Sequence, residues 1–334
     1  MKFSIIIPCF NKSLEVVFRT LFSICIQKFP RDQYEIIFVN DGDKKHDYES
    51  LVKCFQLWGI NIKYFYLDNS KSGSPVFAWN YGIMKSKGTI IILNGADILH
   101  LNQTLLHFDR LFLNRDEDVN IEDCVIHKSF KNPAKGVGFN EKVIENPIKD
   151  NLILCVGYVY RYLYNNSFYQ KLFLANEWPQ LLLENKLLEF IETSIKPIDK
   201  LRSKFVMLTG VNRLNGYPFL VAARADLFFE MGGFNEAMYR IGWDDYDWWL
   251  RSTFFAKTVF CPKIKAIHQW HRLNSSLKKD NDKNRHAGIV LMRNLFDKYF
   301  IRPTANIGID WGTFNKIENK YIEEIISSSE SMRG

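Results

Sequence analysis

The sequence predicts an α/β fold built on a doubly wound, mostly parallel sheet flanked by helices. The first hundred residues alternate between short apolar runs rich in β-branched residues and longer amphipathic runs, which is the pattern of parallel strands joined by helices. Polar residues directly follow each apolar run. With 334 residues, of which 47% are apolar, the chain is long enough to bury a large core.

Each element of this first half has its own signal. The apolar runs predict strands, the runs with a period of 3.6 residues predict helices, and the pair Asp41-Gly42 predicts a turn. The expected strands are residues 3–8, 34–40, 62–67 and 89–94, and the expected helices are 14–27, 48–58 and 75–86.

The polar residues after the strands predict where a ligand binds. Ligands of open parallel sheets bind beyond the carboxyl ends of the strands. The residues in that position are 9–12, 40–43, 68–70 and 94–97.

The second half is less regular. Residues 216–224 predict a loop and a buried strand, followed by a helix that the segment GGFNE at 232–236 ends. Residues 152–190 mix Tyr, Phe and Leu with Arg and Lys, and the helical spacing of 181–188 favours a buried helical pair over a segment lying on a membrane surface. Residues 287–299 predict an amphipathic helix.

Charge and cysteine usage bound the function. The net charge of +7 comes from 44 basic and 37 acidic residues, and no basic run is interleaved with aromatic residues, so we expect no nucleic-acid binding. A mild positive charge suits an anionic small molecule or membrane lipids. The six cysteines lack metal-site spacing, which predicts free thiols in a reducing compartment. Without an apolar run long enough to span a bilayer, we expect a cytoplasmic protein, with peripheral contact at the inner membrane face left open.

An acidic cluster near the end of the second half predicts catalysis. Asp244, Asp245 and Asp247 lie among the tryptophans 243, 248 and 249. Apolar rings that remove water from a carboxylate raise its pKa toward neutral pH, where general bases work best. The alternative is an ordinary helix start with acids in its first turn and tryptophans in the core. Trp243 also offers a flat surface for a sugar ring, whereas Trp248 and Trp249 are expected in the core.

Three segments together resemble the nucleotide-sugar-binding half of glycosyltransferase family 2, which has the GT-A fold. They are SIIIPCFNKS at 4–13, EIIFVNDGD at 35–43 and SGSPVFAWNYGIMKSKGTIIILNGAD at 72–97. The resemblance implies a nucleotide diphosphate sugar as donor. It implies a donor site made of Pro8, Phe10, Asn11, Asn40, Asp41, Asn80, Asn94 and Asp97, with Asp41 reaching the base or ribose. Arg224 is a further candidate for the diphosphate, the alternative being a surface arginine paired with an acid.

The resemblance also implies a divalent ion, Mn²⁺ or Mg²⁺, held by Asp97 and His268. The family usually has Asp-x-Asp after the fourth strand, where this chain reads Leu-Asn-Gly-Ala-Asp at 93–97. Asn94 would then add a neutral carbonyl ligand, and His271 competes with His268. The departure leaves three alternatives: a weaker metal site, stabilisation of the phosphates by Lys and Arg, or loss of activity.

The C-terminal segments GGFNE and GWDDYDWWLR resemble those of inverting β-glycosyltransferases, including the galactosyltransferase-like group. The resemblance implies that Asp245 is the base that deprotonates the acceptor hydroxyl, and that Asp244 and Trp243 bind the acceptor. Asp244 and Asp245 can exchange roles because the match is one residue short. Asp247 is expected to cap or orient the helix.

The expected function is an inverting transfer of a hexose or N-acetylhexosamine from a nucleotide diphosphate sugar, with UDP favoured, to a carbohydrate or lipid-linked saccharide. Surface polysaccharide synthesis, such as lipopolysaccharide or capsule, is the implied setting. The alternatives are a retaining N-acetylgalactosaminyl-type transferase and a non-catalytic scaffold that binds nucleotide or glycan. The expected units are a donor half at 1–100, a variable connection at 101–205, an acceptor and catalytic half at 206–275 and a helical extension at 276–334.

Overall fold

The structure is a computed structural model, and it describes most of the first 113 residues and separate parts of the rest. The described residues are 1–69, 74–113, 125–127, 153–162, 177–184, 186–187, 189–190, 205–209, 219–238, 244–252, 255–269, 305–306 and 311–312. Trp243, His271 and the predicted helix at 287–299 lie outside them, as does nearly all of the predicted extension at 276–334.

The first four long strands form a parallel sheet, as the sequence predicts. Their order is β3-β2-β1-β4, and all three pairings between them are parallel. The chain therefore runs outward from the central β1 in both directions. Their bounds are β1 (Phe3–Cys9), β2 (Tyr34–Asn40), β3 (Ile62–Tyr66) and β4 (Ile90–Asn94).

The sheet continues beyond β4 as a mixed half. Beyond β4 the order is β9-β7-β10-β5, with β6 paired to β10 and β8 to β7. Only the β7–β10 pairing of this half is parallel among the described strands. The bounds are β5 (Ile98–His100), β6 (Val125–His127), β7 (Ile153–Tyr162), β8 (Phe205–Thr209), β9 (Leu220–Arg224) and β10 (Lys257–His268).

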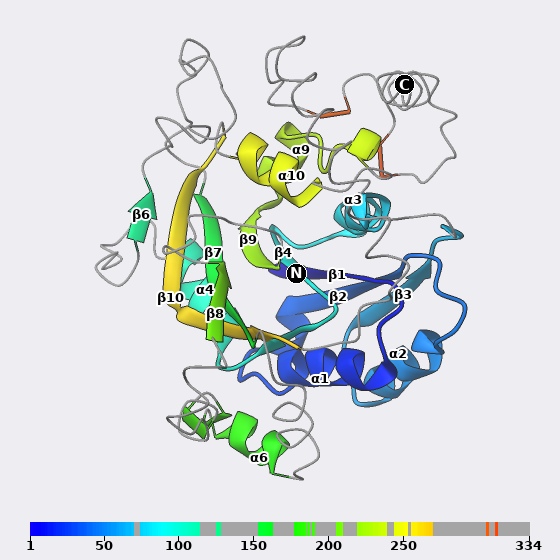
Figure 1. The fold of residues 1–334 in the computed structure, drawn as a ribbon, viewed down its shortest axis with the longest axis vertical. Helices are drawn as coiled ribbons and strands as arrows, with labels where there is room; N and C mark the ends of the chain where they lie inside the picture. Colours follow the sequence, from blue (N-terminus) through cyan, green and yellow to red (C-terminus); the bar gives the residue numbers. More distant parts are fainter. Residues whose placement is uncertain are drawn as a thin grey trace, which may run out of the picture.

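Helices cover both faces of this sheet, so the predicted α/β fold of the GT-A type is confirmed. Figure 1 shows α1 and α2 on one side and α3, α9 and α10 on the other. The longer helices are α1 (Leu14–Cys25), α2 (Tyr48–Leu57), α3 (Val76–Lys85), α4 (Thr104–Leu113), α6 (Trp178–Leu183), α9 (Ala225–Glu230) and α10 (Asp244–Ser252). Two 3₁₀ turns, η1 (Arg31–Gln33) and η4 (Glu236–Met238), accompany them.

Alternation along β1 explains the two layers. Ile5 and Ile7 pack into a core with α1, α2 and α4, whereas Ile6 packs into a second core with α3, α9 and α10. Successive side chains of a strand point to opposite faces, so one apolar run serves both cores. This is why the inner strands β1, β2 and β4 are mostly apolar and buried rather than alternating with polar residues.

The second core is built on stacked aromatic rings. Trp248 stacks on Phe234 with ring centroids 5.4 Å apart, and Phe234 stacks on Trp79 at 5.6 Å. Trp248 and Trp249 are both buried, which confirms their prediction as core residues. The stack joins α10 to α3 and so fixes where the acidic start of α10 lies.

The prediction of a buried helical pair over residues 152–190 is wrong for its first part. Residues 153–162 form β7, which lies inside the sheet between β9 and β10. The helical spacing at 181–188 corresponds to α6, which spans Trp178–Leu183. Buried strands and buried helix segments have a similar apolar composition, so composition did not distinguish β7 from a helix. The helical period at 181–188 gave no information about residues 153–162.

Two further expectations concern the described residues as a set. None of the described helices has the length and apolar character needed to cross a bilayer. The five described cysteines are free thiols. They are Cys9, Cys25, Cys54, Cys155 and Cys261.

Candidate active site

Lys12, Asp97 and His268 meet where β1 and β4 end. Lys12 Nζ lies 2.6 Å from Asp97 Oδ2, and His268 Nε2 lies 3.4 Å from the same oxygen. The chain leaves β1 and β4 in opposite directions along the sheet, and such a switch point is where open α/β sheets bind ligands. The three side chains are 20%, 8% and 16% exposed, so they line the surface without extending into solvent.

The register of the sheet brings His268 to Asp97. His268 at the end of β10 pairs with Ile98 at the start of β5, the residue after Asp97. The backbone oxygen of Asp97 also accepts a hydrogen bond from the N–H of Gln269 at 2.7 Å. The predicted pairing of Asp97 with His268 is thus a direct result of the antiparallel β5–β10 ladder.

The Asn94 side-chain oxygen makes a hydrogen bond inside the protein. Its Oδ1 lies 2.7 Å from His100 Nε2, and His100 Nδ1 lies 2.8 Å from Gln27 Nε2. Since the Gln27 amide donates to Nδ1, His100 is neutral with its proton on Nε2, and burial lowers its pKa to about 3. His100 is therefore a structural residue, and the Asn94 carbonyl points to it rather than to a ligand.

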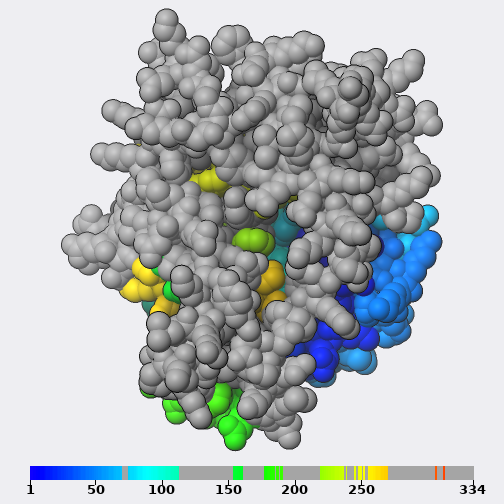
Figure 2. Space-filling model, viewed as in Figure 1, coloured from blue at the N-terminus to red at the C-terminus, as the bar shows by residue number. Residues whose placement is uncertain are grey.

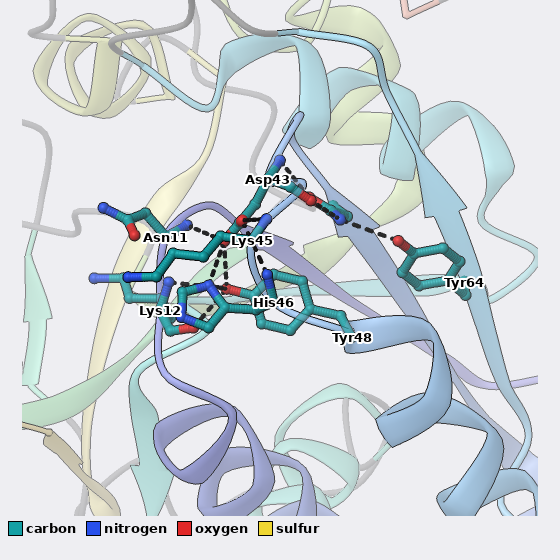
Figure 3. Close-up of polar contacts among 8 residues, drawn as sticks. Asn11, Lys12, Asp43, Lys45, His46, Tyr48 and Tyr64 are labelled. Atoms are coloured by element: carbon teal, nitrogen blue, oxygen red, sulfur yellow. Dashed lines mark hydrogen bonds and ion pairs between the residues drawn. The ribbon is translucent and has the colours of Figure 1, made fainter.

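A network centred on Asp43 holds the loop that carries Lys12 (Figure 3). Asp43 Oδ2 accepts the backbone N–H of Asn11 at 2.9 Å and lies 2.8 Å from His46 Nδ1 and 2.9 Å from the Tyr48 hydroxyl. Burial alone would raise the pKa of Asp43, but the hydrogen bonds from His46, the Lys45 amide and Tyr48 outweigh it and lower the pKa. Asp43 is thus held as a carboxylate.

Tyr48 links this network to Lys12. The backbone N–H of Lys12 donates to the Tyr48 hydroxyl at 2.9 Å, and the backbone oxygen of Lys12 lies 2.6 Å from it. Asn11, one residue earlier, has a φ of 50°, a left-handed conformation in which asparagine is one of the few favoured residues. The turn after β1 is therefore fixed on both sides of Lys12.

The predicted donor residues of the first two turns lie along the same edge of the sheet. Pro8 is buried within β1 opposite Val39 of β2, and Phe10 is 37% exposed just beyond the strand. Asp41 is buried and accepts a hydrogen bond from the Asn69 amide at 2.7 Å.

Asn40 closes the turn between Asp41 and the Asp43 network. The Asn40 amide donates to the Asp43 backbone oxygen at 2.8 Å and to the Tyr64 hydroxyl at 3.0 Å. It therefore shapes the turn from within.

Asn80 lies apart from these residues and has a structural part. Its side chain donates to the Phe234 oxygen and to Glu236 Oε1, each at 2.9 Å, and accepts the Phe234 N–H at 2.7 Å. Asn80 is completely buried, so it joins α3 to the GGFNE segment from inside the molecule.

The acids of α10 have three different environments. Asp244 is buried beside Ser74, and burial, followed by the charge of Asp245, raises its pKa to about 7. Asp245 is partly exposed. Asp247 is 2.8 Å from Arg251 Nε in a buried i,i+4 pair, so it orients the helix as expected.

Ser74 relates the start of α10 to the edge of the sheet at which the parallel strands end. It lies just before α3, in the connection that follows the carboxyl end of β3. Because β3, β2, β1 and β4 are parallel, their carboxyl ends share one edge, and the connection that carries Ser74 leaves the sheet from this edge.

Arg224 is not brought to this edge. It pairs in register with Ile90, where β4 begins, whereas Asn94 and Asp97 follow the other end of that strand. Its guanidinium is exposed and lies 3.0 Å from Asp226, which is the surface pairing that the sequence left open. The expected acceptor residue Trp243 and the competing His271 lie outside the described residues.

A divalent ion does not fit the described residues as they stand. Asp97 and His268 offer one carboxylate and one imidazole, but Lys12 already places a cation against the same Asp97 oxygen. The Asn94 carbonyl is taken by His100. Within the described parts of the chain, no group of three or more His, Cys, Asp or Glu residues could hold a metal ion.

Three residues of this site were given no individual role from the sequence, although Lys12 and Asp43 lie in the ranges 9–12 and 40–43 expected beside a ligand. Lys12 had a usable signal, since it lies in the turn after the first strand and precedes the helix-capping Ser13. Asp43 ends the segment EIIFVNDGD, one of the three that carry the family resemblance. Ser74 became apparent only from the packing of α10 on α3.

Segments from distant parts of the sequence surround this region. In Figure 2, blue, yellow-green and gold atoms from the first strands, from the 220s and from β10 come together near the middle of one face.

Comparison with known proteins adds family information. The family model of Glycosyl transferase family 2 matches residues 4–172. No curated protein matches the chain significantly in sequence.

Several solved structures resemble the chain at low sequence identity. The mannosyltransferase PcManGT from Pyrobaculum calidifontis, in complex with GDP-Man and Mn²⁺, is 13% identical with a TM-score of 0.47, covering 87% of this chain and 63% of its own. S. aureus TarS 1-349 with UDP-GlcNAc is 15% identical with a TM-score of 0.48, covering 98% and 71%. GalNAc-T7 with UDP, GalNAc and Mn²⁺ is 16% identical with a TM-score of 0.47, covering 86% and 48%.

Proposed function

The chain belongs to glycosyl transferase family 2, and we propose that it transfers a sugar from a nucleotide diphosphate sugar to an acceptor hydroxyl. The observation that carries this proposal is the cluster of Lys12, Asp97 and His268 at the switch point of the sheet. Lys12 and Asp97 lie within the residues that the family match covers, and the pairing of β10 with β5 brings His268 to them. A partly accessible cation at that edge suits the phosphates of a donor.

Asp245 is the proposed base. A base must touch the acceptor hydroxyl, and the partly exposed Asp245 is accessible, whereas Asp244 is buried against Ser74. The neighbouring Asp244, whose pKa is raised to about 7, lets the pair hold one proton near neutral pH. Asp244 then positions Asp245 and the acceptor through its hydrogen bonds.

The proposed reaction is a single displacement. The acceptor oxygen attacks the anomeric carbon while its proton passes to Asp245, and the bond from that carbon to the diphosphate oxygen breaks. The diphosphate leaves as an anion at the edge that carries Lys12. Such a displacement inverts the anomeric centre and gives a β-linkage from an α-linked donor.

Within this proposal UDP is the favoured nucleotide, and a hexose or N-acetylhexosamine is the favoured sugar. Asp41 supports a pyrimidine or ribose contact because a carboxylate accepts the imide N–H of uracil or ribose hydroxyls. A saccharide of a surface polysaccharide, free or lipid-linked, is the proposed acceptor. The same acids at the start of α10 are compatible with a retaining transferase, and the anomeric configuration of the product separates the two.

Turnover of donor sugars tests the function. The chain is incubated with UDP-, GDP- and dTDP-sugars and a panel of saccharide acceptors, and release of the nucleoside diphosphate and the product's anomeric configuration are measured. We expect Asp245→Asn to lower transfer by about 10²- to 10⁴-fold while nucleotide binding is retained. Asp226→Asn, on the exposed start of α9, is the matched control. Nucleotide or glycan binding with no turnover in the native chain would instead support a scaffold.

A further inference from the structure

We infer that Lys12 takes the part of the divalent cation, so that this chain binds and releases its nucleoside diphosphate without a metal ion. The inference rests on the proposed function. It starts from the disagreement between the usual Asp-x-Asp ligands of the family and the residues found here. Of the three alternatives that the sequence left open, this is stabilisation of the phosphates by a basic side chain, and that side chain is Lys12.

The position of Lys12 Nζ carries the inference. It lies 2.6 Å from Asp97 Oδ2, the oxygen that also has His268 Nε2 at 3.4 Å. A cation that Asp97 and His268 held together would lie against this oxygen, because it is the Asp97 oxygen that His268 approaches. The ammonium is already there, and like charges repel, so a divalent ion has to displace it.

The other side chains that could bind a metal ion support the same inference. Of the chain's residues 93–97, Asn94 turns its carbonyl to His100, and Asp97 is the remaining acid. Divalent ions such as Mg²⁺ prefer several oxygen ligands, and one carboxylate is a poor site for them. One carboxylate is enough for an ammonium, whose three N–H donors can bridge a carboxylate and a phosphate at once.

The backbone of Lys12 is prepared for this use. Tyr48 contacts both the N–H and the carbonyl oxygen of Lys12, and the Asp43 carboxylate holds Tyr48 and the preceding residue Asn11 (Figure 3). A flexible lysine side chain normally loses rotamer freedom when it binds. Here the fixed backbone and the bond to Asp97 reduce that loss, so the cation is in place before the donor arrives.

The role of Lys12 in the reaction is electrostatic. As the bond between the anomeric carbon and the diphosphate oxygen breaks, the electron pair stays on the diphosphate, and the Lys12 ammonium stabilises that charge. Lys12 transfers no proton in this step, since the acceptor proton goes to Asp245.

Calorimetric titration tests the inference with UDP, GDP and dTDP as probes, each in EDTA and in Mn²⁺. For the native chain we expect one diphosphate to bind with the same affinity in both conditions. Lys12→Ala should weaken that binding in EDTA by about ten- to a hundred-fold, and Lys12→Arg should largely retain it. In Lys12→Ala, Mn²⁺ should restore part of the affinity, because Asp97 and His268 then face a vacated cation position.

Lys53→Ala is the matched control, because Lys53 forms an exposed ion pair with Glu49 on α2 and is expected to leave binding unchanged. Thermal melting confirms that each variant is folded. Binding by the native chain that requires Mn²⁺, with Lys12→Ala unaffected, overturns the inference and leaves the proposed function standing. No binding of any of the three diphosphates in either condition overturns both.

Discussion

Asp244 and Asp245 are adjacent acids that the fold treats differently. Asp244 is buried beside Ser74, and its raised pKa comes from burial and from the charge of Asp245. A folded protein tolerates such a costly group when its function needs it. The cost predicts a stability effect that is independent of any assay of activity.

Replacing Asp244 by Asn should stabilise the protein above neutral pH. The pKa of Asp244 is about 7 in the folded chain against an ordinary 3.8, so the folded state binds the extra proton between these values. Its contribution to stability is present below about pH 4 and is lost as the pH rises to about 7. Asp244→Asn removes the charge, so its free energy of unfolding should exceed that of the native chain by a few kcal/mol at pH 8.

Urea unfolding at pH 8 and pH 4 measures this difference. The gain at pH 8 should shrink toward zero at pH 4, where the native carboxyl is protonated as well. Equal stabilities of Asp244→Asn and the native chain at pH 8 would show that Asp244 carries no buried charge.

His100 gives the opposite pH dependence. Burial lowers its pKa to about 3 from 6.5, so its stabilising effect is complete above about pH 6.5 and declines as the pH falls toward 3. His100→Ala leaves the Asn94 carbonyl and the Gln27 amide without their partner, and should cost about 2–4 kcal/mol at pH 7. This cost should be about 2 kcal/mol smaller at pH 5, where the native chain already keeps His100 neutral against its ordinary pKa.

Urea unfolding of His100→Ala and the native chain at pH 5 and pH 7 measures both numbers. His107→Ala is the comparison variant: burial also lowers the pKa of His107 on α4, but this ring is only partly buried, so a smaller pH dependence in the same direction is expected. A cost of His100→Ala that is unchanged between the two pH values would contradict a neutral, buried His100.

The proximity of Asp97 and His268 was predictable from the sequence. Asp97 and His268 were chosen together from the sequence, and the β5–β10 ladder brings them within 3.4 Å. Lys12 lies in the range 9–12 expected beside a ligand but was given no role of its own, because a single lysine after a strand is usually a surface residue. Asn80 and Asn94 lie in segments that resemble the family. Their hydrogen-bond partners Phe234 and His100 could not be predicted from the local sequence around each asparagine.

The loop before α10 is organised by Arg251. Its Nη1 donates to the Met231 oxygen and its Nη2 to the Gly233 oxygen, both at 2.9 Å, while Nε pairs with Asp247. Gly233 has a φ of 66°, and an added Cβ would lie 2.5 Å from Asn80 Oδ1. The Gly-Gly pair of GGFNE is thus required by backbone conformation and by close packing against α3.

Breaking this clamp should unfold the second core before the first. Arg251→Met leaves Asp247 as an unpaired buried acid and removes a donor from the Met231 and Gly233 oxygens, of which the Met231 oxygen keeps the Ala305 N–H, and we expect a loss of about 3–5 kcal/mol. Chemical denaturation followed by tryptophan fluorescence measures it, because Trp248 and Trp249 lie in this core. The double variant Arg251→Met with Asp247→Leu should recover part of the loss. A single variant as stable as the native chain would refute the clamp.

Elements were predictable where their period was clear. The four strands and three helices predicted in the first hundred residues form within two residues of their expected bounds, because buried parallel strands and amphipathic helices differ strongly in pattern, whereas the short β5 was not predicted. β7 was mistaken for part of a helical pair, since its place in the sheet depends on pairing with β9 and β10 far along the chain. Register between such distant strands has no local signal.

The whole molecule brings three separate segments to one edge. The β1 turn supplies Lys12, the β4–β5 turn supplies Asp97, and the end of β10 supplies His268, with α10 fixed above α3 by stacked rings (Figure 1). The first hundred residues indicated the fold class, and the segments 4–13, 35–43 and 72–97 together indicated the family. It did not indicate that a cation is already present at the donor edge.

Thermal melting of the native chain with UDP, GDP, dTDP and CMP in EDTA tests the central claim most directly. A ligand that binds only the folded state at a hundred times its Kd adds about 2.7 kcal/mol to the free energy of unfolding. We predict that one nucleoside diphosphate raises the melting temperature without added metal, and that Lys12→Ala loses this rise. No rise with any of the four nucleotides, with or without Mn²⁺, would contradict a nucleotide-sugar site in this protein.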